Sequence, residues 1–180
     1  MRDLDSLPMP AWDLIDIEPY RQLWLKHHGY FSLNIATTRG CPYKCNWCAK
    51  PIYGNRYNSR APERVVDEIE FLLKKYQPNH FWMCDDIFGL KPGWVQKFES
   101  LVTARNLKFK YKIQSRVDLL LEEDTVSALA KSGAGICAGE RRSSAAAMRI
   151  NASSVMRCFR PHPPKCRRHA PLPRVFSQTG

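Results

Sequence analysis

The sequence has no run of apolar residues long enough to span a membrane. Its first residues, MRDLDSLPMPAWDL, also lack the apolar core of a signal peptide. These absences predict a cytoplasmic protein, and 180 residues suffice for one domain with a hydrophobic core. Because thiols stay reduced in the cytoplasm, clustered cysteines there indicate metal binding or catalysis before disulfides.

Acidic residues are absent from residues 141–180. All 17 Asp and Glu precede this segment, together with 19 of the 28 Lys and Arg. The net charge of +11 is therefore mainly a property of a basic tail. A basic tail can serve as an arm that binds nucleic acid, which gives one candidate function.

Strand and helix patterns alternate along the rest of the chain. The segment YFSLNIATT alternates apolar and polar residues, and the continuous apolar run HFWMC is typical of a strand covered on both faces, with Cys84 buried. Strands are expected at 30–38, 80–84 and 109–116, and helices at 61–76, 94–106 and 122–133. This order indicates βαβ units and therefore an α/β fold with a parallel sheet.

Polar or thiol-bearing groups follow each expected strand. Cys41–Cys48 follow the first, Asp85 and Asp86 the second, and residues 114–116 end the third. The carboxyl ends of parallel strands meet at one edge of the sheet, where such folds bind their ligands. We therefore expect the three groups to converge there.

The three cysteines have the spacing Cys41-x3-Cys45-x2-Cys48. A structural zinc site needs four ligands, and the nearest candidates, His28 and His80, lie far along the chain. A four-iron cluster held by three thiolates would instead leave one iron open for a substrate or cofactor. Both an incomplete zinc loop and an open iron–sulfur site agree with the spacing.

This CxxxCxxC motif, placed after a first strand with Trp47 before its third cysteine, resembles the radical S-adenosylmethionine (radical SAM) superfamily. The resemblance implies a TIM-like (βα) barrel and a [4Fe-4S] cluster held by Cys41, Cys45 and Cys48. S-adenosylmethionine (SAM) would chelate the fourth iron, with Trp47 near its adenine. An electron from the cluster would cleave SAM to a 5′-deoxyadenosyl radical that takes hydrogen from a small-molecule substrate. A reductant such as flavodoxin or ferredoxin is also implied.

The flanking segments, NIATTRGCPYKCNWCAKPIYGNRYNSRAPERVVDEI and DDIFGLKPGWV, resemble the cobalamin-associated branch of that superfamily. This branch includes methyltransferases and the anaerobic Mg-protoporphyrin ester cyclase type. The resemblance predicts a linker or entry segment at 1–29 and the N-terminal part of the barrel, about three βα units, at 30–134. Cobalamin is expected for the full-length family, and the domain that binds it is expected to be absent from this chain.

The resemblance also implies roles for further residues at positions that match the family. Asp85 and Asp86 match the place where the superfamily binds the SAM amino group, although Asp also commonly caps a turn before a helix. Ser115 and Arg116 could hold the SAM carboxylate or ribose. The alternative for Arg116 is a salt bridge to Asp118 or Glu122. Arg56, Tyr57 and Arg60 either meet the substrate or belong to a solvated loop.

Residues 135–180 depart from the family pattern. They are rich in Arg, Pro, Ala and Ser, and they show neither strand nor helix period where a fourth strand is expected. This composition is typical of GC-rich coding DNA read out of frame, so we expect a frameshifted, disordered tail and a truncated barrel. The alternative function is a small zinc- or Fe-S-binding module whose basic tail contacts nucleic acid. In the tail, Cys158, His162, Cys166 and His169 could bind zinc, although Cys and His are also frequent products of such DNA read out of frame.

Overall fold

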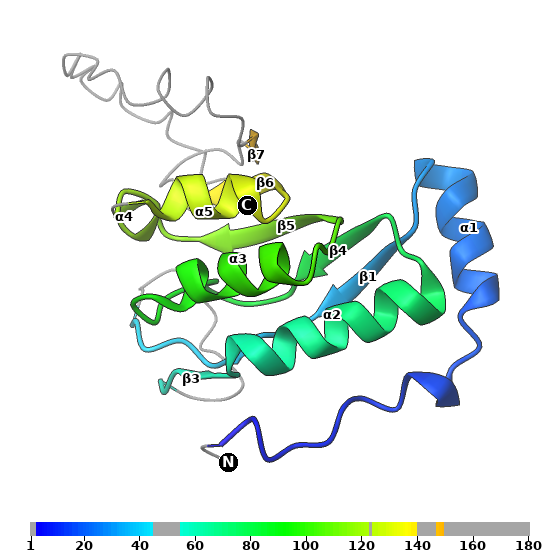
Figure 1. The fold of residues 1–180 in the computed structure, drawn as a ribbon, viewed down its shortest axis with the longest axis horizontal. Helices are drawn as coiled ribbons and strands as arrows, with labels where there is room; N and C mark the ends of the chain where they lie inside the picture. Colours follow the sequence, from blue (N-terminus) through cyan, green and yellow to red (C-terminus); the bar gives the residue numbers. More distant parts are fainter. Residues whose placement is uncertain (1–2, 45–54, 123, 140–146, 150–180) are drawn as a thin grey trace, which may run out of the picture.

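In a computed structural model, the chain forms a main sheet with helices packed against one of its faces (Figure 1). The structure describes residues 3–44, 55–122, 124–139 and 147–149. Within these ranges, no helix has both the length and the apolar character needed to cross a membrane.

The main sheet has the strand order β1-β4-β5-β6-β7. Its strands are β1 (Ser32–Ile35), β4 (His80–Met83), β5 (Lys110–Ser115), β6 (Ala134–Gly139) and β7 (Ala147–Arg149). The first four run parallel, and only β7 is antiparallel to its neighbour. The α/β fold with a parallel sheet is therefore confirmed.

Strand β6 corrects one prediction, because residues 135–139 were expected to belong to a disordered tail. This strand pairs with β5 from Ala134 opposite Tyr111 to Gly139 opposite Ser115. Its sequence, AGICAG, shows no alternating pattern, but an exposed strand edge supplies the backbone partners that a further strand needs. The rest of the expected tail lies outside the described residues, except for β7.

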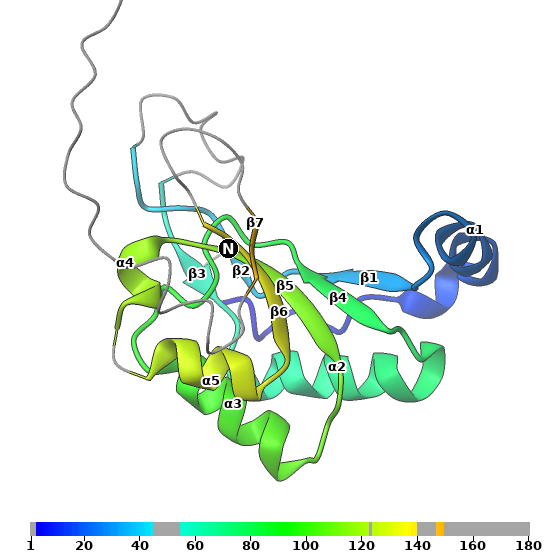
Figure 2. The same cartoon turned by 90° about the horizontal axis from the view of Figure 1, so that it is seen from above.

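Three helices cover one face of the sheet, namely α2 (Pro62–Tyr76), α3 (Trp94–Ala104) and α5 (Thr125–Lys131) (Figure 2). The short α4 (Val117–Leu120) follows β5 directly. Before β1 come a 3-10 turn, η1 (Trp12–Leu14), and α1 (Glu18–His28). Helix α1 was not expected within the entry segment. Pro19 lies in the first turn of this helix, where proline is tolerated.

Helix α2 shows how the local sequence sets its own limits. Pro62 stands at its first position, and Gln77 ends it in the left-handed conformation while its N–H donates to the carbonyl of Leu72. Val65 and Ile69 lie on the buried face, as helical spacing requires. Glu68 shares that face, so this helix brings a carboxylate into the interior.

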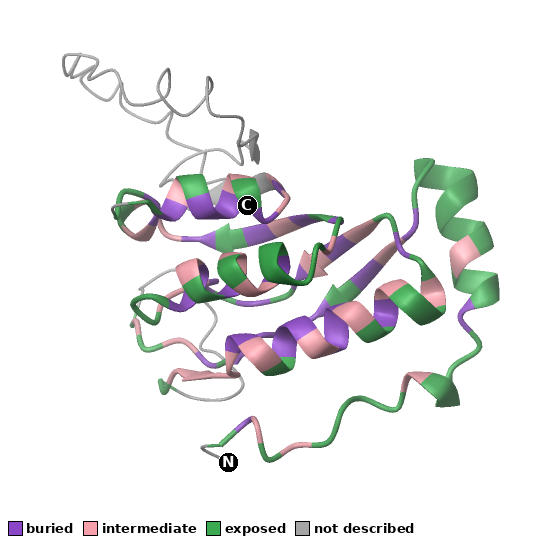
Figure 3. Cartoon of the chain, in the orientation of Figure 1, coloured by how far each residue is buried: buried purple, intermediate pink, exposed green. Residues whose placement is uncertain are grey.

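The core lies between the helices and the sheet (Figure 3). Its largest fully buried side chains include Phe81, Phe88, Phe98 and Tyr111. Along β4, burial alternates, with Phe81 and Met83 buried and His80 and Trp82 only partly so. The expectation that this strand is covered on both faces was therefore wrong among the described residues. An apolar run that contains tryptophan hides the period of two, because Trp is also common at partly exposed positions.

Gly133 starts the turn from α5 into β6 with a φ of 102°, and an added Cβ would meet the carbonyl oxygen of Phe109. Gly133→Ala should therefore lower the free energy of unfolding by more than about 2 kcal/mol, measured by urea titration. Gly29 gives a matched control, since its φ is 73° and the space around it is open. Gly29→Ala should cost only about 1 kcal/mol. Equal losses in the two variants would contradict the backbone clash.

Candidate functional site

The described parts of the three expected groups lie at the carboxyl edge of the sheet. Cys41 follows β1 and the two-residue strand β2 (Thr38–Arg39), Asp85 and Asp86 follow β4, and Ser115 ends β5. Figure 1 shows this edge of the sheet, where β3 (Asn58–Ser59) and α4 also lie. Cys45, Trp47 and Cys48 lie outside the described residues. Among those that are described, no group of three or more His, Cys, Asp or Glu is placed to hold a metal ion.

The two ends of the cysteine-bearing segment are held together. Strand β2 pairs antiparallel with β3 (Asn58–Ser59), and the N–H of Arg60 donates to the carbonyl of Thr37 at 2.9 Å. We call residues 37–39 and 58–60 the loop base and residues 40–57 the cysteine loop. The loop thus leaves the sheet and returns to it at one place.

Asp85 fixes the first half of the loop base. Its side chain is 2 % exposed. Oδ1 accepts hydrogen bonds from the N–H groups of Thr37, at 2.7 Å, and Thr38, at 2.8 Å. Oδ2 accepts one from the hydroxyl of Thr37 at 2.5 Å. Burial raises the pKa of Asp85, and the hydrogen bonds from the two threonines oppose this rise.

Tyr57 lies at the far end of the cysteine loop and is partly buried. Burial, assisted by the negative charge of Asp85, raises the pKa of its phenol to about 12. Hydrogen bonds from the backbone of Leu90 and Lys91 act in the opposite direction. Tyr57 therefore remains a neutral phenol at physiological pH.

Arg60 fixes the second half of the loop base through contacts with α2 and with the end of β1. Its guanidinium donates to Glu68 at 2.6 Å and to the carbonyl of Ala36 at 3.1 Å. Glu68 is 2 % exposed and also accepts a hydrogen bond from the indole of Trp12 at 3.2 Å. These contacts were not expected, since Arg60 was predicted to meet substrate or lie in a solvated loop.

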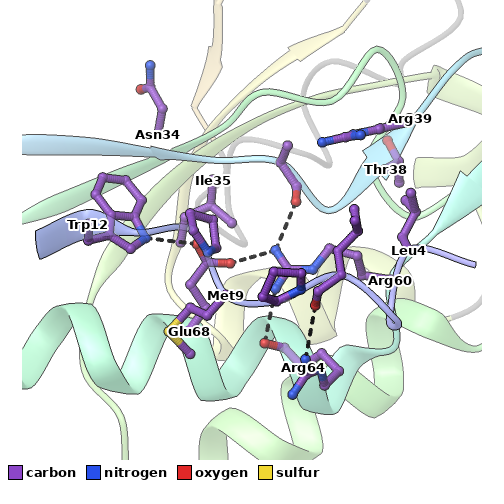
Figure 4. Close-up of a pocket in the computed structure, with 14 residues that line it drawn as sticks. Leu4, Met9, Trp12, Asn34, Ile35, Thr38, Arg39, Arg60, Arg64 and Glu68 are labelled. Atoms are coloured by element: carbon purple, nitrogen blue, oxygen red, sulfur yellow. Dashed lines mark hydrogen bonds and ion pairs between the residues drawn. The ribbon is translucent and has the colours of Figure 1, made fainter. Parts of the chain in front are cut away.

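The Arg60–Glu68 pair lies in a cavity of about 170 Å³ between the entry segment, β1 and α2 (Figure 4). Figure 4 shows both side chains between the helix and the strand. The interaction joins three segments that are distant in sequence: the entry segment through Trp12, the loop base through Arg60, and α2 through Glu68. The residues that line this cavity therefore help to hold the loop base in place.

The two adjacent aspartates have different environments. Asp85 is buried and accepts three hydrogen bonds, whereas Asp86 is exposed at the edge of the sheet. Cys84, expected to be buried, is exposed as well. Asp86 is thus the member of the pair whose carboxylate can reach a bound ligand.

Ser115 and Arg116 also make internal contacts. Ser115 is buried, and its hydroxyl donates to the carbonyl of Phe88 at 3.0 Å. Arg116 donates to Asp118 through Nε and Nη2, each at 3.0 Å, and its guanidinium lies 4.1 Å from the ring centroid of Tyr43. The salt bridge to Asp118, foreseen as the alternative, is therefore present. It lowers the pKa of Asp118. Because Tyr43 lies in the cysteine loop, Arg116 joins that loop to the end of β5.

Neither histidine weighed as a fourth zinc ligand is near Cys41 in the fold. His80 begins β4, at the edge of the sheet opposite the cysteine loop, and its Nδ1 lies 2.9 Å from the hydroxyl of Ser32. His28 ends α1, before the strand that leads to the cysteines. The two residues therefore belong to other parts of the structure.

Comparison with known proteins assigns the chain to a family. The family model described as the radical SAM superfamily matches residues 35–137. The anaerobic magnesium-protoporphyrin IX monomethyl ester cyclase of Rubrivivax gelatinosus is 30% identical over 135 residues, which are 74% of this chain and 23% of that protein. An uncharacterized methyltransferase of Pyrococcus horikoshii is 26% identical over 124 residues, 68% of this chain and 26% of that protein.

Solved structures agree in fold. The radical S-adenosylmethionine methyltransferase TsrM from Kitasatospora setae, with cobalamin and a [4Fe-4S] cluster bound, aligns with a TM-score of 0.56 at 21% identity. The alignment covers 77% of this chain and 24% of that one. The chain thus spans about a quarter of the length of the relatives it matches. Because the family model covers more than half of its residues, this chain belongs to the radical SAM superfamily of enzymes.

Proposed function

We propose that the cysteine loop holds a [4Fe-4S] cluster through Cys41, Cys45 and Cys48 and that SAM binds beside it. The protein is then a radical SAM enzyme of the cobalamin-associated lineage, which acts on a small-molecule substrate and takes electrons from a reductant such as flavodoxin or ferredoxin. One observation supports this most strongly. The loop with the family's cysteine spacing leaves the carboxyl edge of a parallel sheet through a base fixed by Asp85 and Arg60.

The residues that are present fit such a cluster. Thiolates are the ligands that iron–sulfur clusters take, and three of them lie within eight positions of one loop. Gly40, directly before Cys41, has a φ of 81°, which turns the chain out of β2 at the first proposed ligand. When bound, the cluster would supply the electron that cleaves SAM to a 5′-deoxyadenosyl radical.

The chain's own side chains would bind and orient SAM. Asp86, exposed at the edge of the sheet, can accept hydrogen bonds from the SAM ammonium group. Arg116 can donate to the SAM carboxylate, and its contacts with Tyr43 and Asp118 hold its guanidinium in place. Asp85 and Ser115 would then position the loop and the strand ends, and Trp47 would pack near the adenine.

Anaerobic reconstitution with iron and sulfide tests this proposal. The full chain should take up about four irons, and the EPR signal of the reduced cluster should change when SAM is added. Cys41→Ala should reduce the iron content several-fold, because two thiolates hold a cluster poorly. Cys84→Ala is the matched control, since Cys84 is an exposed thiol at the end of β4. Tight binding of zinc with no iron, or an unchanged cluster in Cys41→Ala, would overturn the proposal.

A further inference from the structure

The face of the sheet opposite the helices carries its own set of side chains. Alternate residues of β1, β4 and β5 pack into the core, so the residues between them point to the other side. Figure 4 shows Asn34 on the side of β1 away from α2. We call this surface the open face; its described residues are Ser32, Asn34, His80, Trp82, Lys110, Lys112 and Gln114.

Within β1, β4 and β5 the open face has cationic and neutral groups, and the first acid on this side, Asp86, lies beyond the end of β4 at the edge of the sheet. None of its described residues is acidic, and two are lysines. His80 adds no counter-charge, and burial together with the nearby Lys112 lowers its pKa, so the imidazole is neutral at pH 7. The surface therefore favours a ligand with negative charge.

Lys112 is held in a defined position on this face. It stands opposite Trp82 in the parallel register, and its Nζ lies 3.6 Å from the centroid of the indole ring. Such a contact fixes the ammonium group without neutralising it, because the ring carries no net charge. No described carboxylate forms an ion pair with Lys112. The ammonium therefore keeps its charge available to a partner.

Neutral hydrogen-bonding groups flank this cation. Asn34 lies opposite Trp82 on the neighbouring strand, and Gln114 lies two residues beyond Lys112, toward the cysteine loop. With neighbouring strands about 4.8 Å apart, Asn34 and Lys112 stand roughly 10 Å apart across the sheet. Both amides can donate a hydrogen bond to a ligand held at Lys112.

We propose that the open face binds the substrate and that Lys112, held on Trp82, receives an anionic group of it, a carboxylate or a phosphate. The identification of this ligand as the substrate rests on the proposed function, because the same sheet edge would carry the cluster and SAM. A charge-assisted hydrogen bond from the fixed ammonium would orient the substrate relative to that edge. Lys112 is thus a specificity residue that selects an acidic substrate over its neutral analogue.

Titration of the full ¹⁵N-labelled chain with three small probes tests this inference. Benzoate, phenyl phosphate and the neutral benzamide have the same ring and differ in charge. The observable is the indole N–H signal of Trp82, one of five tryptophans, which is assigned from its loss in Trp82→Phe. One or both anions should shift this signal to saturation, and which anion binds more tightly tells carboxylate from phosphate. Benzamide should bind at least tenfold more weakly.

Two lysine variants determine whether the anion binds at Lys112 itself. Lys112→Gln should weaken anion binding about tenfold or more. Lys131→Gln removes the same charge from an exposed position of α5, on the helix-covered side of the sheet, and should leave the affinity within about twofold. Equal binding of benzamide, or equal losses in the two variants, would overturn the inference.

Iron content and EPR spectra, recorded in parallel, report on cluster assembly and so test the proposed function separately from anion binding. Failure of cluster assembly with intact anion binding would count against the proposed function alone.

Discussion

Asp85→Ala should destabilise the fold by about 3–5 kcal/mol and prevent cluster assembly. The substitution leaves the buried N–H groups of Thr37 and Thr38 and the Thr37 hydroxyl without their acceptor. Each unsatisfied group costs about 1–3 kcal/mol. Urea titration gives the loss of stability, and the iron content after reconstitution gives the loss of the cluster. Asp86→Ala is the matched control for folding, because Asp86 is exposed.

Asp85→Asn should behave differently, because the amide can retain all three contacts. Its oxygen can accept from the two backbone N–H groups that Oδ1 now binds, and its NH₂ can donate to the Thr37 hydroxyl. Cluster assembly should then persist. If Asp85→Asn loses the cluster as completely as Asp85→Ala, the carboxylate charge acts directly on SAM or the cluster, and its assignment as a positioning residue is wrong.

The difference in stability between the natural protein and Asp85→Asn should depend on pH in a defined direction. The pKa of Asp85 is raised in the folded state, mainly by burial, above the value of about 3.9 for an unfolded chain. Its contribution to stability is therefore fully present below the unfolded pKa and is lost as pH rises through the folded pKa. Asp85→Asn cannot ionise, so its stability relative to the natural protein should increase from pH 4 to pH 7. Urea titrations at several pH values measure this difference, and an opposite trend would mean that hydrogen bonding outweighs burial.

Glu68→Ala is expected to have the second large effect, a loss of about 3–5 kcal/mol. Glu68 is almost fully buried, and its removal leaves the Arg60 guanidinium without its carboxylate and the Trp12 indole without its acceptor. Breaking an ion pair from one side costs this much where the remaining charge is largely shielded from water, and the Arg60 side chain is only 18 % exposed. Chemical unfolding measures the loss.

Two further variants determine whether the buried charge is the cause. The double variant Arg60→Met with Glu68→Leu removes both charges and should be more stable than Glu68→Ala alone. Glu70→Ala, on the same helix, removes a carboxylate that is 28 % exposed and pairs with Lys74 and Arg105, and it should have little effect. A loss in Glu68→Ala no larger than that in Glu70→Ala would show that solvent reaches Arg60.

The elements that the sequence predicted well are those with many residues on one face. Helix α2 repeats its buried positions over four turns, and β5 alternates over its whole length, so each could be recognised alone. Strands β2 and β3 have two residues each and carry no period. They form because Asp85 and Arg60, both distant in sequence from β2, hold the loop base in place.

The convergence of the candidate site on one edge was also predictable, since it follows from the order of strands alone. The separation of Asp85 from Asp86 was not recognised, although the alternation of β4 contains the signal. Phe81 and Met83 are buried, and the same period continued past the strand places Asp85 inside and Asp86 outside. The burial of Glu68 likewise follows from its spacing to Val65 and Leu72, but a charged residue on an apolar face is readily passed over.

The closure of the loop base makes the cysteine loop a replaceable unit. Its entry and exit are joined by β2, β3 and the hydrogen bond from Arg60 to Thr37. The position of the two loop ends therefore does not depend on the number of residues between them. Lengthening a loop whose ends are already fixed costs little, about 0.6 kcal/mol for each doubling. Loops with other ligand spacings could thus be transplanted between residues 40 and 57, and evolution could vary metal chemistry on this scaffold without redesigning its core.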